Sequence, residues 1–388
     1  MKQKILQMTL ALLVCAGAHA QVNSGSNGSD GAFNPTTNTN INMTDHPNGI
    51  YQFTSVNIPG NVQVTFTPNA ANTPVVWLVQ SNCVISGQIN LDAQATGLGV
   101  GGTGGPGGYA GGNGGSVPTP GQGPGAGPAG TSSTYGGAAS YGSLGSFSPP
   151  GLIYGNAFLL PLIGGSGGGG NTSYYRNLAG GGGGGAILIA APNIQLNGGI
   201  SANGANGSFW NDGSGGYGNG AGGSGGAVRL IANIISGTGS ITAGGNYGSS
   251  GGSGRIRFDT YQNSFGGNIS GVFTQGYQPI IIPTSGQGVQ LSIASVAGAS
   301  ISATPSGQLI TPDAIISGQQ ANPISIVVNC SNLPLNTPIT VTVNPATGSP
   351  VSAVGHNTTG TLASSTATVS LNMPRGGGII YATAATSN

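Results

Sequence analysis

Glutamate is absent from the 388-residue chain, and lysine occurs only at positions 2 and 4. Charged residues make up 3% of the sequence, and beyond residue 20 they are five arginines and six aspartates. General acid–base catalysis near neutral pH usually employs histidine, glutamate, lysine or a perturbed aspartate, so most enzyme chemistry has few candidates here. The net charge of −1 beyond residue 20 also predicts no binding to nucleic acid or to anionic lipid.

Cysteine is scarce as well. Beyond residue 20 only Cys83 and Cys330 occur, far apart in the sequence. An exported chain could join them, but two cysteines do not make a disulfide framework. They could equally be two small apolar side chains buried at strand positions, and the sequence leaves both interpretations open.

The sequence has no apolar run long enough to cross a bilayer. The N-terminus instead has the three parts of a secretory signal: Lys2 and Lys4, an apolar stretch over 5–14, and a small-x-small pattern that ends at Ala20. We therefore expect cleavage after Ala20, no membrane insertion, and a mature protein that is secreted or displayed at the cell surface.

Composition divides the chain beyond the predicted signal peptide of residues 1–20. An N-terminal region has short alternating strands, a second region is dominated by glycine, proline and serine, a third has strands between glycine-rich inserts, and a fourth has regular β-strand spacing. The predicted boundaries are 21–96, 97–185, 186–284 and 285–388.

An internal repeat crosses the first of these boundaries. Four strand-like tetrapeptides, each followed by a second strand-like piece, begin at Val75, Ala186, Ala227 and Arg255. A short two-strand unit that cannot bury its own apolar face is typical of a stacked solenoid. The sequence therefore predicts an all-β chain with a parallel β-helix-like solenoid as its core.

Alternation along the repeat predicts which side chains face inward. The predicted inward rows are Val76, Ile187, Val228 and Ile256, followed by Leu78, Ile189, Leu230 and Phe258. The position between the two rows is predicted to point outward to solvent, and it holds Trp77, Leu188, Arg229 and Arg257. A slip by one residue would turn both arginines inward, so we expect this register to be well determined.

The glycine runs allow two interpretations. Between Gly101 and Gly115 about two of every three residues are glycine, which matches the three-residue turn of a polyproline II helix. Without side chains such helices could pack closely and share backbone hydrogen bonds, as polyglycine II. A flexible linker is the alternative for 97–185, although Tyr109 and Tyr135 interrupt the runs in a way that pure linkers rarely show.

The last hundred residues have the pattern of a separate domain. Alternating strands are predicted at 289–293, 324–328, 339–343 and 367–371. Short strands at this spacing favour an immunoglobulin-like β-sandwich.

Two blocks near the N-terminus, 29–35 and 45–59, and the stretch 184–190 resemble segments of uncharacterised, glycine-rich exported bacterial proteins. This resemblance covers nearly the whole chain and implies export and a β-rich, adhesin-like structure, but no activity. The triplet-glycine segments are also similar in composition to the polyglycine II tips of certain phage tail-fibre adhesins.

Catalysis has few candidates. His46 and His356 lie in turn or loop patterns, and no nucleophile elbow, zinc spacing or phosphate loop occurs. A polysaccharide hydrolase would need two convergent carboxylates, which Asp92 and Asp259 could supply only if the first and fourth repeats met. A lyase would have only Asp212 and the arginine column. We therefore expect neither catalysis nor a cofactor or metal, with a polysaccharide-active enzyme as the alternative.

Binding is the better supported class. Aromatic and amide side chains in exposed loops suit sugar recognition through stacking and hydrogen bonds. Candidate binding residues are Tyr174, Tyr175, Arg176, Trp210, Asp212, Tyr217, Arg229, Tyr247 and Arg257. The sequence thus predicts a structural, adhesin-like protein with an extracellular polysaccharide or another cell surface as partner. Ice or crystal-surface binding is the second alternative.

Overall fold

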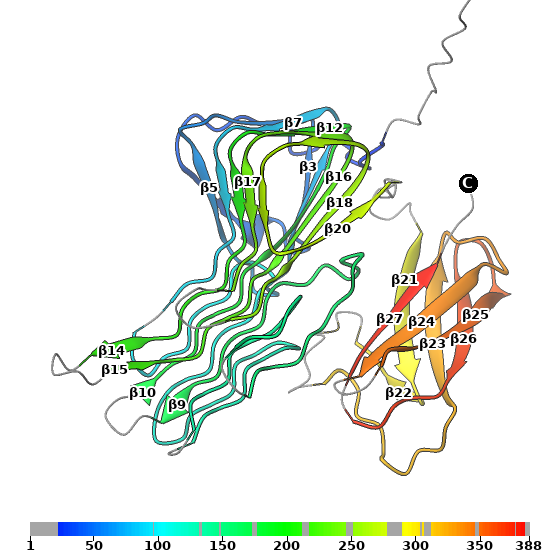
Figure 1. Ribbon diagram of the computed structural model, residues 1–388. Helices are drawn as coiled ribbons and strands as arrows, with labels where there is room; N and C mark the ends of the chain where they lie inside the picture. The colour runs from blue at the N-terminus through cyan, green and yellow to red at the C-terminus, as the bar shows by residue number, and fades with distance from the viewer. Residues whose placement is uncertain are drawn as a thin grey trace, which may run out of the picture.

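The computed structural model describes residues 22–95, 97–131, 134–146, 149–172, 177–211, 217–245, 251–277, 289–302, 305, 312–345, 349–376 and 378–384. Apart from a one-turn 3-10 helix, η1 (Met43–Asp45), the regular elements in these residues are all β-strands. Two parallel sheets are arranged almost as a barrel, and an antiparallel, sandwich-like sheet follows (Figure 1). The prediction of an all-β chain is confirmed.

The parallel strands form three stacks. The first contains β3 (Ile50–Phe53), β6 (Val75–Val79), β11 (Ala186–Ala190), the first halves of β16 (Ala227–Gly237) and β18 (Arg255–Phe265), and β20 (Val272–Gly276). The second contains β1 (Ala32–Phe33), β4 (Ser55–Ile58), β7 (Asn82–Ile85), β12 (Asn193–Leu196) and the second halves of β16 and β18. The third contains β2 (Thr39–Asn42), β5 (Gln63–Thr67), β8 (Gln88–Asn90), β13 (Gly199–Ser201), β17 (Ser240–Thr242) and β19 (Asn268–Ser270).

Each circuit of the chain adds one strand to each stack in turn. β6, β7 and β8 follow one another in this way, and after a long excursion β11, β12 and β13 pair with them in parallel. Strands from 21–96 and from 186–284 therefore lie in the same sheets. Neighbouring circuits are separated by the usual strand spacing of about 4.8 Å.

The space between the stacks is filled by a single apolar core. The inward rows of the last three repeats are as predicted: Ile187, Val228 and Ile256, then Ile189, Leu230 and Phe258. The first repeat is wrong by one residue, since Val75 and Trp77 pair with Ile187 and Ile189 and face the core. Val76 and Leu78 instead join a smaller apolar cluster on the outside of the first stack. All residues of β6 are apolar, so no polar side chain marked its outer face.

The glycine-rich segments leave the stacks and lie side by side as a layer of extended chains (Figure 1). Backbone hydrogen bonds join them with a period of three residues. Two N–H groups of segment 180–185 donate to segment 109–112, and two others donate to segment 221–224. These bonds run from Gly180 to Gly112, from Gly183 to Tyr109, from Gly181 to Ala221 and from Gly184 to Ser224, at 2.8–2.9 Å. The described parts of 97–185 are therefore ordered by backbone contacts, as the first interpretation of the glycine runs expected.

Close approach explains why this layer needs glycine. A Cβ atom added to Gly183 would lie 2.0 Å from the carbonyl oxygen of Gly165, and one added to Gly223 would lie 1.9 Å from that of Gly182. Real Cβ atoms do not approach backbone atoms so closely. The segments can thus exchange hydrogen bonds with several neighbours only because side chains are missing.

The C-terminal sheet is antiparallel. Its strands are β21 (Gln290–Val296), β22 (Ala299–Ser300), β23 (Ile324–Ser331), β24 (Pro338–Pro345), β25 (Val351–Gly360), β26 (Ser365–Leu371) and β27 (Gly378–Ala384), in the order β22-β21-β23-β26-β25-β24-β27. The four strands predicted here are present, and alternate residues such as Ile326, Val341 and Val369 form a second core. His356, expected in a loop, lies in β25 and is exposed.

Cys83 lies in the core between the stacks and Cys330 in the C-terminal core, and the two are free thiols. Burial raises the pKa of Cys83 to about 12 and also raises the pKa of Cys330. Because the thiolate is the reactive form, we expect neither thiol to react with dithionitrobenzoate at mildly alkaline pH until the protein is unfolded in guanidinium. Rapid release of thionitrobenzoate from the folded protein would contradict this placement.

Candidate binding surface

Two short hairpins extend from the glycine layer at the end opposite to the strand stacks (Figure 1). One pairs β9 (Asn171–Thr172) with β10 (Asn177–Leu178), and the other pairs β14 (Phe209–Asn211) with β15 (Tyr217–Asn219). Their bases are joined, since Ser208 N donates to Ala179 O at 2.8 Å and Ala179 N donates to Ser208 Oγ at 2.7 Å. The layer therefore holds both hairpins side by side.

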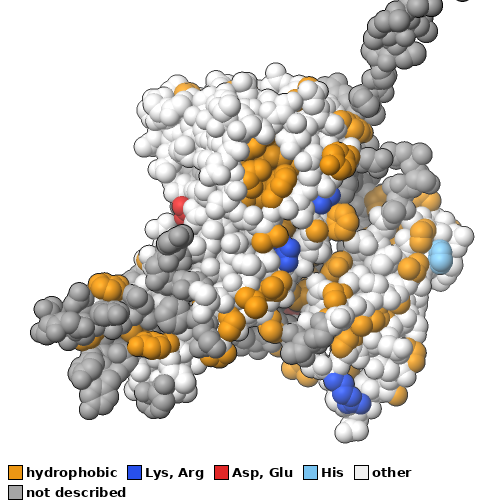
Figure 2. Space-filling model, viewed as in Figure 1, with side chains coloured by type: hydrophobic (Ala, Val, Ile, Leu, Met, Phe, Trp, Pro, Cys, Tyr) orange, Lys and Arg blue, Asp and Glu red, His pale blue; other side chains and the backbone are white. Residues whose placement is uncertain are grey.

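Large apolar side chains gather at this end without being buried. Val117 is 82% exposed and Phe209 is 61% exposed. We call the loop-tip cluster the five exposed residues Leu98, Val100, Val117, Tyr135 and Phe209. Figure 2 shows hydrophobic side chains on this part of the surface.

Backbone hydrogen bonds join the loops that carry the loop-tip cluster to the segment 170–179. The four contacts are Gly99 N to Asn177 O at 2.7 Å, Gly170 N to Thr119 O at 2.9 Å, Gly130 N to Gly170 O at 2.8 Å, and Ser208 N to Ala179 O at 2.8 Å. Each joins one loop that carries a cluster residue to the first hairpin. Side chains from four distant parts of the sequence are thus presented together by a backbone scaffold.

The described residues between 97 and 211 include no charged side chain. From these described residues, a ligand at the loop-tip cluster would meet rings, aliphatic groups, hydroxyls, amides and peptide groups. Arg176 and Asp212, which lie between the paired strands of the two hairpins in the sequence, are outside the described residues. Contact area and stacking are what the described side chains of this surface can offer.

The candidate residues proposed from the sequence fall into three groups, one of which is the pair of arginines in the repeat. Tyr174, Tyr175, Arg176, Asp212 and Tyr247 lie outside the described residues. Trp210 is half-buried in β14, and Tyr217 belongs to β15 of the same hairpin. The structure also adds Leu98, Val100 and Val117, which sequence reasoning missed. Their only signal was a large apolar residue standing alone in a glycine-rich loop.

Arg229 and Arg257 point away from the core, as predicted, but the expectation that solvent surrounds them is wrong. They are 2% and 7% exposed. The segment 154–158 covers Arg257, whose Nη1 donates to Ala157 O at 3.0 Å and whose guanidinium lies 4.9 Å from the ring centre of Phe158. This covering chain lies about a hundred residues earlier in the sequence, so strand alternation could not reveal it.

Asp259 lies between the two arginines and is fully buried. Its Oδ2 accepts from Arg229 Nε at 3.0 Å, and its Oδ1 lies 2.6 Å from Arg257 Nη2, without the alignment of a hydrogen bond. Burial lowers the pKa of Arg229 from its ordinary value, although Asp259 opposes this shift. The group joins the first stack to the covering segment, and its arginines are not open to a ligand.

Asp92 and Asp259, the carboxylates considered for hydrolysis, belong to repeats that are not neighbours. The strands β11 and β16 separate the first repeat from the fourth in the stack. Asp92 Oδ1 accepts a hydrogen bond from Asn203 N at 2.6 Å, and burial raises the pKa of this carboxyl group. The structure thus brings Asp92 to an amide and Asp259 to arginines.

His46 follows η1 and fixes the N-terminal segment. Its Nε2 lies 3.0 Å from Asp30 Oδ1, and its ring stacks on Tyr51 at 4.1 Å between ring centres. Asp30 Oδ2 in turn accepts from the backbone N–H of Gln52 at 2.5 Å. These contacts attach the segment before β1 to the edge strand β3.

Within the described ranges, no three histidine, cysteine or acidic side chains are grouped closely enough to hold a metal ion. The same ranges include no helix with the length and apolar character needed to cross a membrane. No protein-family model, curated protein or solved structure matches the chain.

Proposed function

We propose that the two parallel sheets form a β-helix, that the glycine-rich segments form a polyglycine II-like layer, and that the C-terminal sheet is an immunoglobulin-like sandwich. One strand per stack in each circuit supports the first assignment. Hydrogen bonding with a period of three residues, together with the absence of room for Cβ atoms, supports the second. Alternating antiparallel strands around one core support the third.

We propose that the protein is secreted or displayed at the cell surface, where it acts as a structural, adhesin-like binder. The observation that carries this proposal is the loop-tip cluster, in which apolar and aromatic side chains remain exposed on rigidly held loops. Soluble proteins rarely leave such groups together on the surface unless they contact a partner. The predicted signal peptide agrees with a partner outside the cell.

An extracellular polysaccharide, free or on another cell, is the proposed partner. Phe209, Trp210 and Tyr135 can stack on sugar rings, whose C–H faces are apolar. The described residues of this region carry no charge, and the net charge beyond residue 20 is only −1, which suits a neutral surface better than a nucleic acid or an anionic membrane.

The experiment is a glycan array with the mature protein and the variants Phe209→Ala and Trp210→Ala. We expect wild type to bind a subset of glycans and each variant to bind at least about tenfold more weakly, since truncating an aromatic anchor costs about 2 kcal/mol or more. The control is Tyr277→Ala, which removes a ring that is 75% exposed and follows directly after β20. This variant should leave binding unchanged. Reducing-end release from a bound polymer by wild type would overturn a purely structural role.

A further inference from the structure

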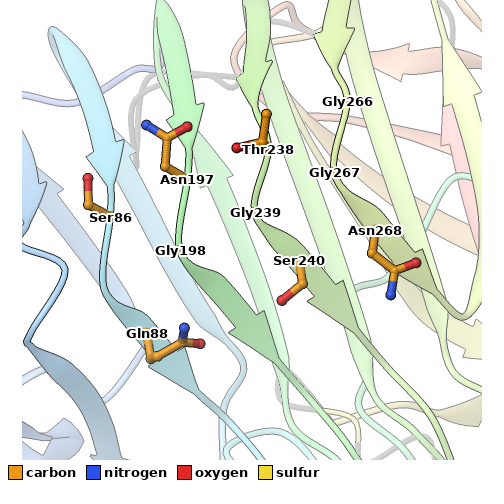
Figure 3. Close-up of a pocket in the computed structure, with 10 residues that line it drawn as sticks. All are labelled: Ser86, Gln88, Asn197, Gly198, Thr238, Gly239, Ser240, Gly266, Gly267 and Asn268. Carbon is orange, nitrogen blue, oxygen red and sulfur yellow. The ribbon is translucent and has the colours of Figure 1, made fainter.

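A second surface, separate from the loop-tip cluster, lies at the corner between the second and third strand stacks. An open groove of about 700 Å³ crosses four successive circuits there. Figure 3 shows three rows along it. Its lining residues are Ser86, Asn197, Thr238 and Gly266 in one outer row, Gly198, Gly239 and Gly267 in the middle, and Gln88, Ser240 and Asn268 in the other outer row.

The bare middle row follows from how the circuits stack. A Cβ atom on Gly239 would lie 2.1 Å from Gly198 O, and one on Gly267 would lie 2.0 Å from Gly239 O. The backbone here is already hydrogen-bonded between circuits, as Asn268 N donates to Gly239 O at 2.9 Å. Glycine is therefore required at this row, and the groove is built into the repeat.

The side chains of the two outer rows are available for hydrogen bonds. On the same outer surface, Asn193 Nδ2 donates to Asn82 Oδ1 at 3.1 Å and Asn203 Nδ2 donates to Thr242 Oγ1 at 3.0 Å. By contrast, within the described part of the chain the groove side chains Ser86, Gln88, Asn197, Thr238, Ser240 and Asn268 make no hydrogen bond to protein. Unlike their neighbours, they are left free to donate to and accept from a ligand.

The chemistry of the rows selects the ligand. No lining residue carries a charge, so an ionic ligand would find no counter-charge. No lining residue has an aliphatic or aromatic side chain, so an apolar ligand would bury little area. Each of the four circuits contributes at least one hydroxyl or amide group to the two rows, at the circuit spacing of about 4.8 Å and so over about 14 Å. Such an array fits a polymer that is uncharged and carries regularly repeated hydroxyls.

We propose that this groove binds a neutral polysaccharide chain that lies along the axis of the stack, across the strands. The hydroxyls of the polymer exchange hydrogen bonds with the two outer rows, and the glycine row lets the chain approach the backbone. The site is independent of the loop-tip cluster, so either one can exist without the other.

The test is affinity electrophoresis of the mature protein through gels that contain hydroxyethyl cellulose, galactomannan, dextran or mannan, with carboxymethyl cellulose as the anionic counterpart of the first. We expect retardation by at least one neutral polymer and weaker or no retardation by carboxymethyl cellulose. The double variant Asn197→Ala/Thr238→Ala should raise the apparent Kd at least about tenfold, because each substitution removes a hydrogen-bonding group.

Gly266→Leu tests the same groove by filling it. A Cβ atom at Gly266 meets no atom within 4 Å, so the fold can accept the side chain. Gly318→Leu is the control, since it is equally open but lies outside the groove. Gly266→Leu should abolish retardation and Gly318→Leu should not.

Several outcomes would overturn the groove as a polysaccharide site. They are no retardation by any neutral polymer, unchanged retardation of both groove variants, or stronger binding of carboxymethyl cellulose than of hydroxyethyl cellulose. Self-association that the groove variants abolish, without polymer binding, would assign the groove to a second copy of the chain. Loss of retardation in Phe209→Ala alone would leave the proposed function intact and exclude the groove.

Discussion

Gly183→Ala should lower the free energy of unfolding by about 3 kcal/mol, which is a large effect for one methyl group. The new Cβ atom would lie 2.0 Å from Gly165 O and 2.2 Å from Gly165 C. Neither partner can move aside easily, because Gly183 N donates to Tyr109 O and Gly165 N donates to Gly184 O. Overpacking costs about 1–3 kcal/mol in cores of flexible side chains, and a backbone obstacle places this variant at the upper end.

Urea or thermal unfolding followed by circular dichroism measures this loss, and Gly266→Ala is the matched control. The added methyl at Gly266 meets open space, so it acts mainly by restricting the unfolded chain and should be neutral or stabilising by up to about 1 kcal/mol. Opposite signs for the same chemical change would support the ordered glycine layer. Equal effects at both positions would show that segment 180–185 is not packed as described.

The sequence could predict this layer only in part. The Gly-Gly-x pattern near Gly101 indicated a three-residue period, and the structure has hydrogen bonds with that period. The pattern could not predict which segments are neighbours, because every glycine run offers the same backbone groups and no distinguishing side chains. Pairing is set instead by where the β-strands deliver each loop, such as Gly185 just before β11 and Gly226 just before β16.

The register of the strands shows the same dependence on marker residues. Arg229 and Arg257 fixed the alignment of β16 and β18 because a charged residue strongly disfavours the apolar interior. β6 has no such marker, and its alignment was wrong by one residue. Burial of the arginines was missed for a different reason. It depends on the contact of the segment 154–158 with the first stack, which joins residues about a hundred positions apart.

The candidate surfaces were predictable to different degrees. Aromatic residues in glycine-rich inserts pointed to the hairpin that contains Trp210, yet the neighbouring Val117 and Leu98 attracted no attention as isolated apolar residues. The groove had a visible sequence signal, a glycine that follows a polar residue at the same place in three of the repeats, as at Gly198 and Gly239. This signal could be interpreted only with the structure, in which stacking of the circuits aligns the equivalent positions into continuous rows (Figure 3).

Asp259→Asn should lower the free energy of unfolding by about 3–5 kcal/mol. The substitution keeps the shape of the side chain but removes the negative charge that lies 2.9 Å from Arg229 Nη2 and 2.6 Å from Arg257 Nη2. Both guanidinium groups remain buried, and neither can readily lose its proton. Breaking a buried ion pair by removing one partner is costly because it leaves charge without compensation.

Denaturant unfolding measures this loss, with Asp45→Asn as the control, since that aspartate is exposed and its replacement should change stability by no more than about 0.5 kcal/mol. A third variant separates charge from packing. Replacing all three buried groups by apolar residues, as in Arg229→Leu/Arg257→Met/Asp259→Leu, should recover much of the lost stability because no uncompensated charge is left. If Asp259→Asn instead proves as mild as the control, water must reach these arginines, and the segment 154–158 does not cover the first stack in solution.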